Sequence, residues 1–248
     1  MNFVNQFLSQ FTWLDWLGLA WFLLCWTGYE RIVDRGWRGR ITLLEETHRL
    51  RLYWARQMLI RENRIVDVGL VGNLVHSVSF YANTSIYIIA GLFATLGALD
   101  RFMETAADLP FAHAISREAL ELKLLMLIAV FVVAYFKFTW SLREFNVLSI
   151  IMGAVPPKEH DTEELELFAQ RTAAVNTCAG DDFNRGIRAY YFGMAILAWM
   201  VMPGLFIIAT TLIFVVLARR EFDSEVLRAL RLQVVARPPS GREVDTGK

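Results

Sequence analysis

Two long stretches without a formal charge constrain the fold of this chain more than any other feature. No Asp, Glu, Lys or Arg occurs from Val68 to Leu99, and none occurs from Ala189 to Ala218. Each stretch has about thirty residues, whereas a helix crosses the hydrocarbon core of a bilayer in about twenty. Two such helices inside a water-soluble protein would need a much larger polar body around them. The pattern therefore predicts an integral membrane protein.

Composition supports this class and narrows the alternatives. The chain has 248 residues, of which 55% are hydrophobic and 20% charged, and its formal net charge is zero. This balance gives no reason to expect a nucleic-acid partner. Arg31 is the first basic residue, so no cleavable signal peptide with a basic start is expected. Cys25 and Cys178 lie in unrelated contexts, which argues against a disulfide framework.

Two weaker apolar segments complete the expected membrane part. One follows Asp15, and the other continues past Lys137 as a long helix that leaves the hydrocarbon. The prediction is an all-α, polytopic membrane protein with about four transmembrane helices, over approximately 13–30, 72–99, 122–142 and 190–217. Pro203 should kink the last of them. Residues 1–225 then form one membrane domain, and 226–248 form a tail whose last part is disordered.

The connections between spans are expected to hold helices of their own. Thr42 and Glu45 form a capping box, and an amphipathic, Arg-rich helix follows over about 42–65. It either lies on the membrane or docks on the bundle. A second connecting helix is expected over about 162–178, capped by Asp161 and closed by Gly180, with Asp181 or Asp182 capping the last span.

The second span carries a stripe of polar side chains at helical spacing. Its members are Asn73, His76, Ser77, Asn83, Thr84 and Tyr87. Polar groups in hydrocarbon are costly unless they face protein or water, so the stripe indicates either a polar pathway or hydrogen bonding between helices. His76 could be a proton relay, a metal or haem ligand, or a structural histidine. The other histidines lie in connections, so no metal and no cofactor is predicted.

A second group of candidates lies where the third span should leave the membrane. Lys137, Ser141, Arg143 and Glu144 could line a charged cytoplasmic mouth. In the alternative, Lys137 snorkels to the interface and Glu144 pairs locally in water. Asp181 and Asp182 are either helix caps or a weakly indicated cation site. No phosphate loop, nucleophile elbow, HExxH or dinucleotide fingerprint is present, so an enzyme is not expected.

Several strings of the chain resemble a known membrane family. They include WARQM from Trp54, KFTWS within the third span and FNRGIRAYYF before the fourth. Together with the apolar segments they resemble DUF599, a family of unknown function, over about 15–225. The resemblance implies a four-helix bacterial membrane protein with relatives in plants, and it brings no established activity.

The leading hypothesis is a homo-oligomeric channel or transporter for a small ion or solute, with the polar stripe of the second span lining the path. The alternative is a non-catalytic scaffold or accessory subunit that docks a partner protein or anionic lipid through residues 31–67. A third hypothesis is an intramembrane enzyme whose lipid-like substrate contacts His76. The expected surroundings are membrane lipids in a bacterial inner membrane. Fourteen basic residues against ten favour a periplasmic N-terminus, although the basic tail argues against it.

Overall fold

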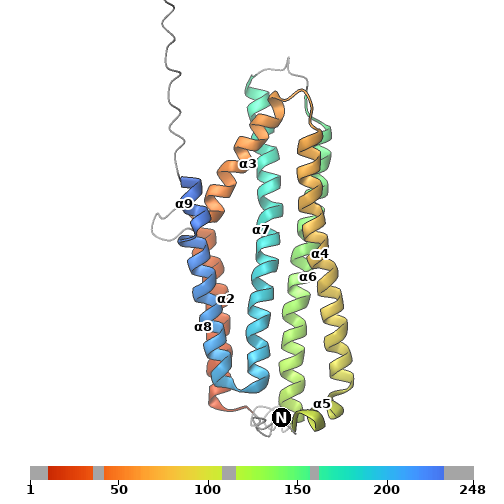
Figure 1. The fold of residues 1–248 in the computed structure, drawn as a ribbon, viewed down its shortest axis with the longest axis vertical. Helices are drawn as coiled ribbons and strands as arrows, with labels where there is room; N and C mark the ends of the chain where they lie inside the picture. Colours follow the sequence, from red (N-terminus) through yellow and green to blue (C-terminus); the bar gives the residue numbers. More distant parts are fainter. Residues whose placement is uncertain (1–10, 36–41, 108–115, 157–161, 232–248) are drawn as a thin grey trace, which may run out of the picture.

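The computed structural model describes residues 11–35, 42–107, 116–156 and 162–231, and within these ranges the protein is helical without strands. This confirms the all-α class. The helices are listed here in chain order (Figure 1): α2 (Trp13–Arg35), α3 (Leu43–Ile60), α4 (Ile65–Gly97), α5 (Leu99–Ala107), α6 (Arg117–Gly153), α7 (Thr162–Val201), α8 (Pro203–Phe222) and α9 (Glu225–Arg231).

The long helices run up and down in an elongated bundle around a central pair. α6 and α7 pack against each other along most of their length, α4 covers the other side of α6, and α2 and α8 pack beside the lower part of α7. The lower half of the bundle contains α2, α8 and the lower parts of α4, α6 and α7. In the upper half, α3 packs on the continuing parts of the three longest helices (Figure 1).

Aromatic side chains fill the core between the helices. In the lower half, Phe22, Phe192 and Phe206 are buried together, with ring centroids 5.4–5.7 Å apart for the two pairs that Phe22 makes. Higher up, Phe138 of α6 lies over Gly186 of α7, where an added Cβ would be 2.4 Å from the ring. Glycine is required there because any side chain would push the two central helices apart.

The fourth expected span is two helices rather than one kinked helix. Met202 is extended (φ −160°, ψ 150°), and Pro203 begins α8. α7 runs antiparallel to α2, because Trp199 contacts Asp15 and the earlier Phe192 contacts the later Phe22. α8 instead runs parallel to α2. The prediction of a single span over 190–217 was therefore wrong. Proline fits the first turn of a helix, so here it starts a new helix after a reversal.

The connecting helix predicted over 162–178 also differs from the structure. It does not end at Gly180, because α7 continues without a break from Thr162 to Val201. The predicted capping by Asp181 or Asp182 was therefore wrong. Gly180 instead makes room for the side chain of Arg51, as described below. The predicted cap Asp161 and the tail from 232 onward lie outside the described residues.

Other element predictions agree with the structure. The hydroxyl of Thr42 accepts a hydrogen bond from the backbone N–H of Glu45 at 3.1 Å, which confirms the hydroxyl half of the predicted capping box. The Glu45 carboxylate instead accepts from Arg49 at 3.3 Å. α6 is one continuous helix that extends well beyond its apolar segment. Among the described helices, α4 and α6 are long and apolar enough to cross a bilayer.

Candidate functional site

The polar stripe of α4 lies on the outside of the bundle. The side of α4 that packs on the neighbouring helices carries Val71, Val78, Ala82 and Ser85, all buried. Five of the predicted pathway residues are exposed instead: Asn73, His76, Ser77, Asn83 and Tyr87. The sixth, Thr84, is half-buried and donates to the carbonyl of Phe80 at 2.7 Å. The six residues share a helix, but they do not enclose a path within one protomer.

The buried hydrogen bond between α4 and α7 is made by a residue that the sequence did not single out. The hydroxyls of Ser85 and Tyr190 are 2.8 Å apart, and Tyr190 also donates to the carbonyl of Tyr81 at 3.2 Å. Ser85 is fully buried. Ser85 differs from its exposed neighbours only by the face of the helix on which it lies. The sequence pattern does not identify that face, because small and polar residues occur on every side of the helix.

A charged seam joins α6 to α7 in the middle of the molecule; its members are Lys137, Ser141, Glu144, Asp182 and Arg185. Lys137 and Arg185 both donate to Oδ1 of Asp182, at 3.2 and 3.1 Å. Ser141 is buried and donates to the carbonyl of Ala179 at 2.7 Å. The structure thus brings together three of the four residues predicted at the mouth. Arg143 lies apart from them and stacks over the ring of Trp140.

Glu144 is the member of the charged seam that has a buried oxygen without a hydrogen bond. It lies about two turns beyond Lys137, outside the apolar part of α6, and its Oε2 is buried without a hydrogen-bond partner. Burial raises the pKa of this carboxyl and the negative charge of Asp182 raises it further, whereas Lys137 and Arg185 act in the opposite direction. The group is therefore easier to protonate than an ordinary glutamate.

The neighbouring carboxylate, Asp181, faces α3 rather than α6. Its Oδ1 is 3.0 Å from Nε2 of His48 and 3.8 Å from Nη1 of Arg51. Asp181 and Asp182 therefore hold different helices and do not converge on one point. No group of three His, Cys, Asp or Glu side chains in the described ranges is placed to hold a metal ion.

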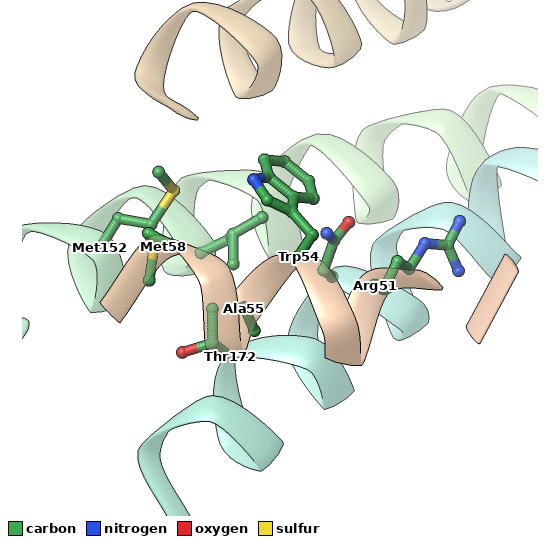
Figure 2. Close-up of a pocket in the computed structure, with 8 residues that line it drawn as sticks. Arg51, Trp54, Ala55, Met58, Met152 and Thr172 are labelled. Carbon is green, nitrogen blue, oxygen red and sulfur yellow. The ribbon is translucent and has the colours of Figure 1, made fainter. Parts of the chain in front are cut away.

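A cavity of about 140 Å³ lies between α3, α4, α6 and α7, just above the level of the charged seam. Its walls combine one cation with small polar and apolar side chains: Arg51, Trp54, Leu74, Ser77, Val78, Phe145, Asn176, Gly180, Phe183 and Asn184. A narrow apolar extension shares Arg51, Trp54 and Asn176 with it. Figure 2 shows this extension, with Arg51 and Trp54 at one end and Met58 and Met152 at the other.

Two buried polar atoms beside the cavity make no hydrogen bond. Asn176 is only 3% exposed, and its Oδ1 makes no hydrogen bond. Nη1 of Arg51 is also buried without one. The guanidinium lies directly on Gly180, where an added Cβ would be in the position that the side chain occupies. Burial lowers the pKa of Arg51 and the carboxylate of Asp181 raises it, so the group remains a cation.

α3 is pinned over this cavity by polar contacts at two places. Trp54 donates from Nε1 to the buried carboxylate of Asp67 at 2.7 Å, where α4 begins. Arg56 donates to both carboxylate oxygens of Glu166 on α7, at 3.0 and 2.6 Å. The roof of the cavity is therefore attached to α4 on one side and to α7 on the other.

A third polar cluster lies at the opposite end of the molecule. Oδ1 of the buried Asp15 accepts from Nε1 of Trp199 at 2.7 Å and is 3.7 Å from Nζ of Lys123. Lys123 is also buried, and it donates to the backbone carbonyl of Trp199 at 3.0 Å. These contacts tie α2 and α6 to the reversal between α7 and α8.

The family model described as "Protein of unknown function, DUF599" matches residues 17–226, which is most of the chain. The chain belongs to the DUF599 family. No curated protein and no solved structure matches it. The strings that resemble DUF599 now have a structural explanation. WARQM holds Trp54 and Arg56, which pin α3, while KFTWS and FNRGIRAYYF supply Lys137, Arg185 and Gly186 to the contact between α6 and α7.

Some residues of this DUF599 site were not predicted. Arg51 is one of nine arginines in its region and has no distinguishing spacing, and Asn176 and Asn184 lie on a helix that was expected to end between them. The correct length of α7 would have placed Asn176 and Gly180 one turn apart on the same face. Even so, only the packing of α3 against α7 identifies this face as the wall of a cavity.

Proposed function

We propose that this DUF599 protein is a homo-oligomeric channel or transporter for a small ion or solute in a bacterial inner membrane. The observation that carries the proposal is the exposed polar face of α4, in a helix that is long and apolar enough to span a bilayer. Polar side chains at membrane depth are expensive unless protein or water covers them.

The lower half of the bundle has the surface of a membrane protein. Large apolar side chains point outward from it, as lipid-facing residues do: Trp13 72%, Leu24 61%, Phe93 54%, Ile208 63% and Leu212 61%. On α6, Lys137 lies sixteen positions after Glu121, and the buried Lys123 is the only charged residue between them. At a rise of about 1.5 Å per residue this segment spans about 24 Å, close to a hydrocarbon core.

The distribution of basic residues supports an orientation. Among the described residues, three basic residues belong to α5 or to the start of α6, which lie at the lower end: Arg101, Arg117 and Lys123. Fifteen belong to α3, to α9, to the connection between α3 and α4, or to the upper parts of α2, α6, α7 and α8: Arg31, Arg35, Arg49, Arg51, Arg56, Arg61, Arg64, Arg143, Arg171, Arg185, Arg188, Arg219, Arg220, Arg228 and Arg231. By the positive-inside rule the upper half is cytoplasmic and the N-terminus periplasmic.

The reversal at Met202 makes this orientation consistent with the basic tail. α7 and α8 each traverse the lower half, so we infer five crossings rather than four, and the chain after α8 lies on the cytoplasmic side. The tail then adds to the positive-inside bias. With a single span over 190–217 it opposed that bias.

A second copy of the chain is the proposed cover for the α4 face. Asn83 and Tyr87 lie within the apolar part of α4, whereas Ser77 is higher and lines the cavity between α4 and α7. Copies that meet through α4 would place these groups around a shared axis. The path would lead from Asn83 toward Asn73 and His76, and the charged seam would line its cytoplasmic mouth.

Liposome flux measurements test this function. Purified wild-type protein should conduct at least one of K⁺, Na⁺, Cl⁻, H⁺ or a small neutral solute above empty vesicles. The variant Asn83→Leu/Thr84→Val, which makes the middle of the stripe apolar, should lower that flux at least tenfold. Asn146→Leu, the same change at an exposed position of α6, is the matched control and should leave the flux unchanged. Flux no greater than that of empty vesicles for every ion and solute would refute the proposal.

The scaffold alternative is favoured by a different surface. The outer face of α3 exposes Leu50, Tyr53 and Ile60 at 44%, 61% and 67%, next to Arg49. Such a face suits a partner protein or an anionic membrane surface. Purification in mild detergent separates the two functions: a stoichiometric foreign protein supports the scaffold, and a pure homo-oligomer supports the channel.

A further inference from the structure

We propose that the cavity between α3, α4, α6 and α7 is a binding site for a phosphate group, either free phosphate or the headgroup of an anionic lipid. Arg51 is its cation, and the side chains of Ser77, Asn176 and Asn184 are its neutral hydrogen-bonding groups. The site is separate from the proposed conduction path on the outer face of α4, except that Ser77 borders both.

The charge of the cavity wall favours an anion. Among the residues that line the cavity, Arg51 is the only ionisable cation and no carboxylate is present. Asp181 is ion-paired with Arg51, but its Oδ1 is 3.8 Å from Nη1, beyond hydrogen-bond distance, and it is closer to His48, at 3.0 Å. Guanidinium groups bind phosphate through parallel N–H donors, and a buried guanidinium nitrogen that makes no hydrogen bond is costly even when a carboxylate lies nearby.

Two buried atoms at the cavity have hydrogen-bonding capacity that no protein group uses. Nη1 of Arg51 and Oδ1 of Asn176 are both buried without hydrogen bonds, and both residues line this cavity. An asparagine amide can turn by 180° and present its NH₂ group in place of its oxygen. Arg51 and Asn176 can then donate to an oxyanion together, and Ser77, whose hydroxyl donates to the carbonyl of Asn73 at 3.0 Å, joins them if its hydroxyl rotates.

The cavity has a suitable size, and its cation is held in place. At about 30 Å³ for each water molecule, a volume of about 140 Å³ accommodates roughly four or five waters, or a small oxyanion with one or two waters. Gly180 supplies the surface on which the guanidinium rests. Trp54 and Arg56 attach α3 over it, which limits the movement of Arg51.

The position of the cavity allows both sources of phosphate. It is lined by α3, α4, α6 and α7 above the segment of α6 that we propose spans the membrane, so a lipid headgroup at the cytoplasmic surface and a solute in the cytoplasm are both candidate ligands. A headgroup would present a phosphodiester, whereas free phosphate would present additional ionised oxygens and would compete with other oxyanions.

Isothermal titration calorimetry in maltoside micelles tests the site with two probes, inorganic phosphate and short-chain phosphatidylglycerol. Wild-type protein is expected to bind at least one of them. Arg51→Gln should weaken that binding at least tenfold, because it removes the cation. Arg49→Gln makes the same change two positions away on the exposed face of α3 and should bind like wild type. Binding of phosphate assigns the free anion, and binding of phosphatidylglycerol alone assigns the headgroup.

Gly180→Ala provides a second route that keeps every charge. Its new methyl group would occupy the place of the Arg51 guanidinium, so it should weaken binding of the same probe about as much as Arg51→Gln. Gly153→Ala, at a position with open space around it, is its control. If Arg51→Gln does not fold by circular dichroism and gel filtration, Gly180→Ala and Asn184→Leu decide the result. Absence of binding by wild type, or equal binding by Arg49→Gln and Arg51→Gln, would overturn the proposal.

Discussion

At the scale of single residues, the protein depends on a few polar side chains at contacts between helices. Lys137 and Arg185 share the carboxylate of Asp182, and Ser85 and Tyr190 join α4 to α7. Glycine has a matching role, because Gly186 admits the ring of Phe138. The family motifs are therefore explained by helix packing, and they do not have to encode a reaction.

Glu144 should make stability depend on pH. Its pKa is raised in the folded protein, so the folded state binds a proton more tightly than the unfolded chain does. The stability that this group supplies is present below the unfolded pKa and is lost as the pH rises through the folded pKa. Glu144→Gln should therefore melt like wild type at about pH 4 and a few degrees higher at about pH 8.

Thermal melts in detergent at both pH values measure this difference. Glu62→Gln is the control, since Glu62 is exposed in the connection between α3 and α4, and it should show no gain at the higher pH. A Glu144→Gln variant that gains equally at both pH values would contradict the assigned cause, which is the ionisation of a buried carboxyl.

At the scale of elements, the reversal between α7 and α8 has a specific physical cause. Pro203 has no N–H, so the carbonyl of Trp199 four residues earlier lacks its helical donor. Nζ of Lys123 supplies a donor at 3.0 Å from α6. Trp199 also stacks on Phe206 across the reversal, with ring centroids 4.9 Å apart. The proline ends one helix and starts another, and Lys123 satisfies the atom that it leaves unpaired.

Lys123→Met should destabilise this reversal strongly. The substitution keeps the apolar stem, removes the donor to Trp199, and leaves Asp15 buried without its cation. Removal of one partner from a buried ion pair costs about 3–5 kcal/mol. Unfolding of the detergent-solubilised protein by SDS or heat measures the loss. Asp15→Asn/Lys123→Met should recover part of it, and a single variant as stable as wild type would refute this role.

At the scale of the whole molecule, three continuous helices join the lower half of the bundle, which we propose lies in the membrane, to the upper half. α4, α6 and α7 pass from one half into the other, while α2 and α8 remain in the lower half and α3 in the upper one (Figure 1).

The proposed five crossings place the two ends of the chain on opposite sides of the membrane. A reporter that is active only in the cytoplasm should therefore work when fused after Lys248 and fail when fused before Met1. Export-dependent alkaline phosphatase, fused at the same two positions, should give the reverse pattern. Equal activity of one reporter at both ends would require an even number of crossings and would contradict this topology.

Much of the fold was determined by the sequence by itself, for reasons that act locally. The charge-free run from Val68 to Leu99 predicted α4, a shorter apolar segment predicted the long α6, and Thr42 predicted where α3 begins. The helical spacing of polar residues identified the stripe on α4 and the group around Lys137. These signals depend on solvation and on neighbours within one turn, which are properties of the chain alone.

Only the tertiary structure decided what these features face. Pro203 is compatible with a kink or a reversal, and the packing of α8 along α2 selects the reversal. In the sequence, Gly180 is compatible with the end of a helix, whereas in the structure it lies within α7 and makes room for Arg51. The α4 stripe could have pointed inward, but Val78 and Ser85 occupy the packed side. Each outcome depends on contacts between residues far apart in the chain, and the energies of such contacts are not encoded in local sequence spacing.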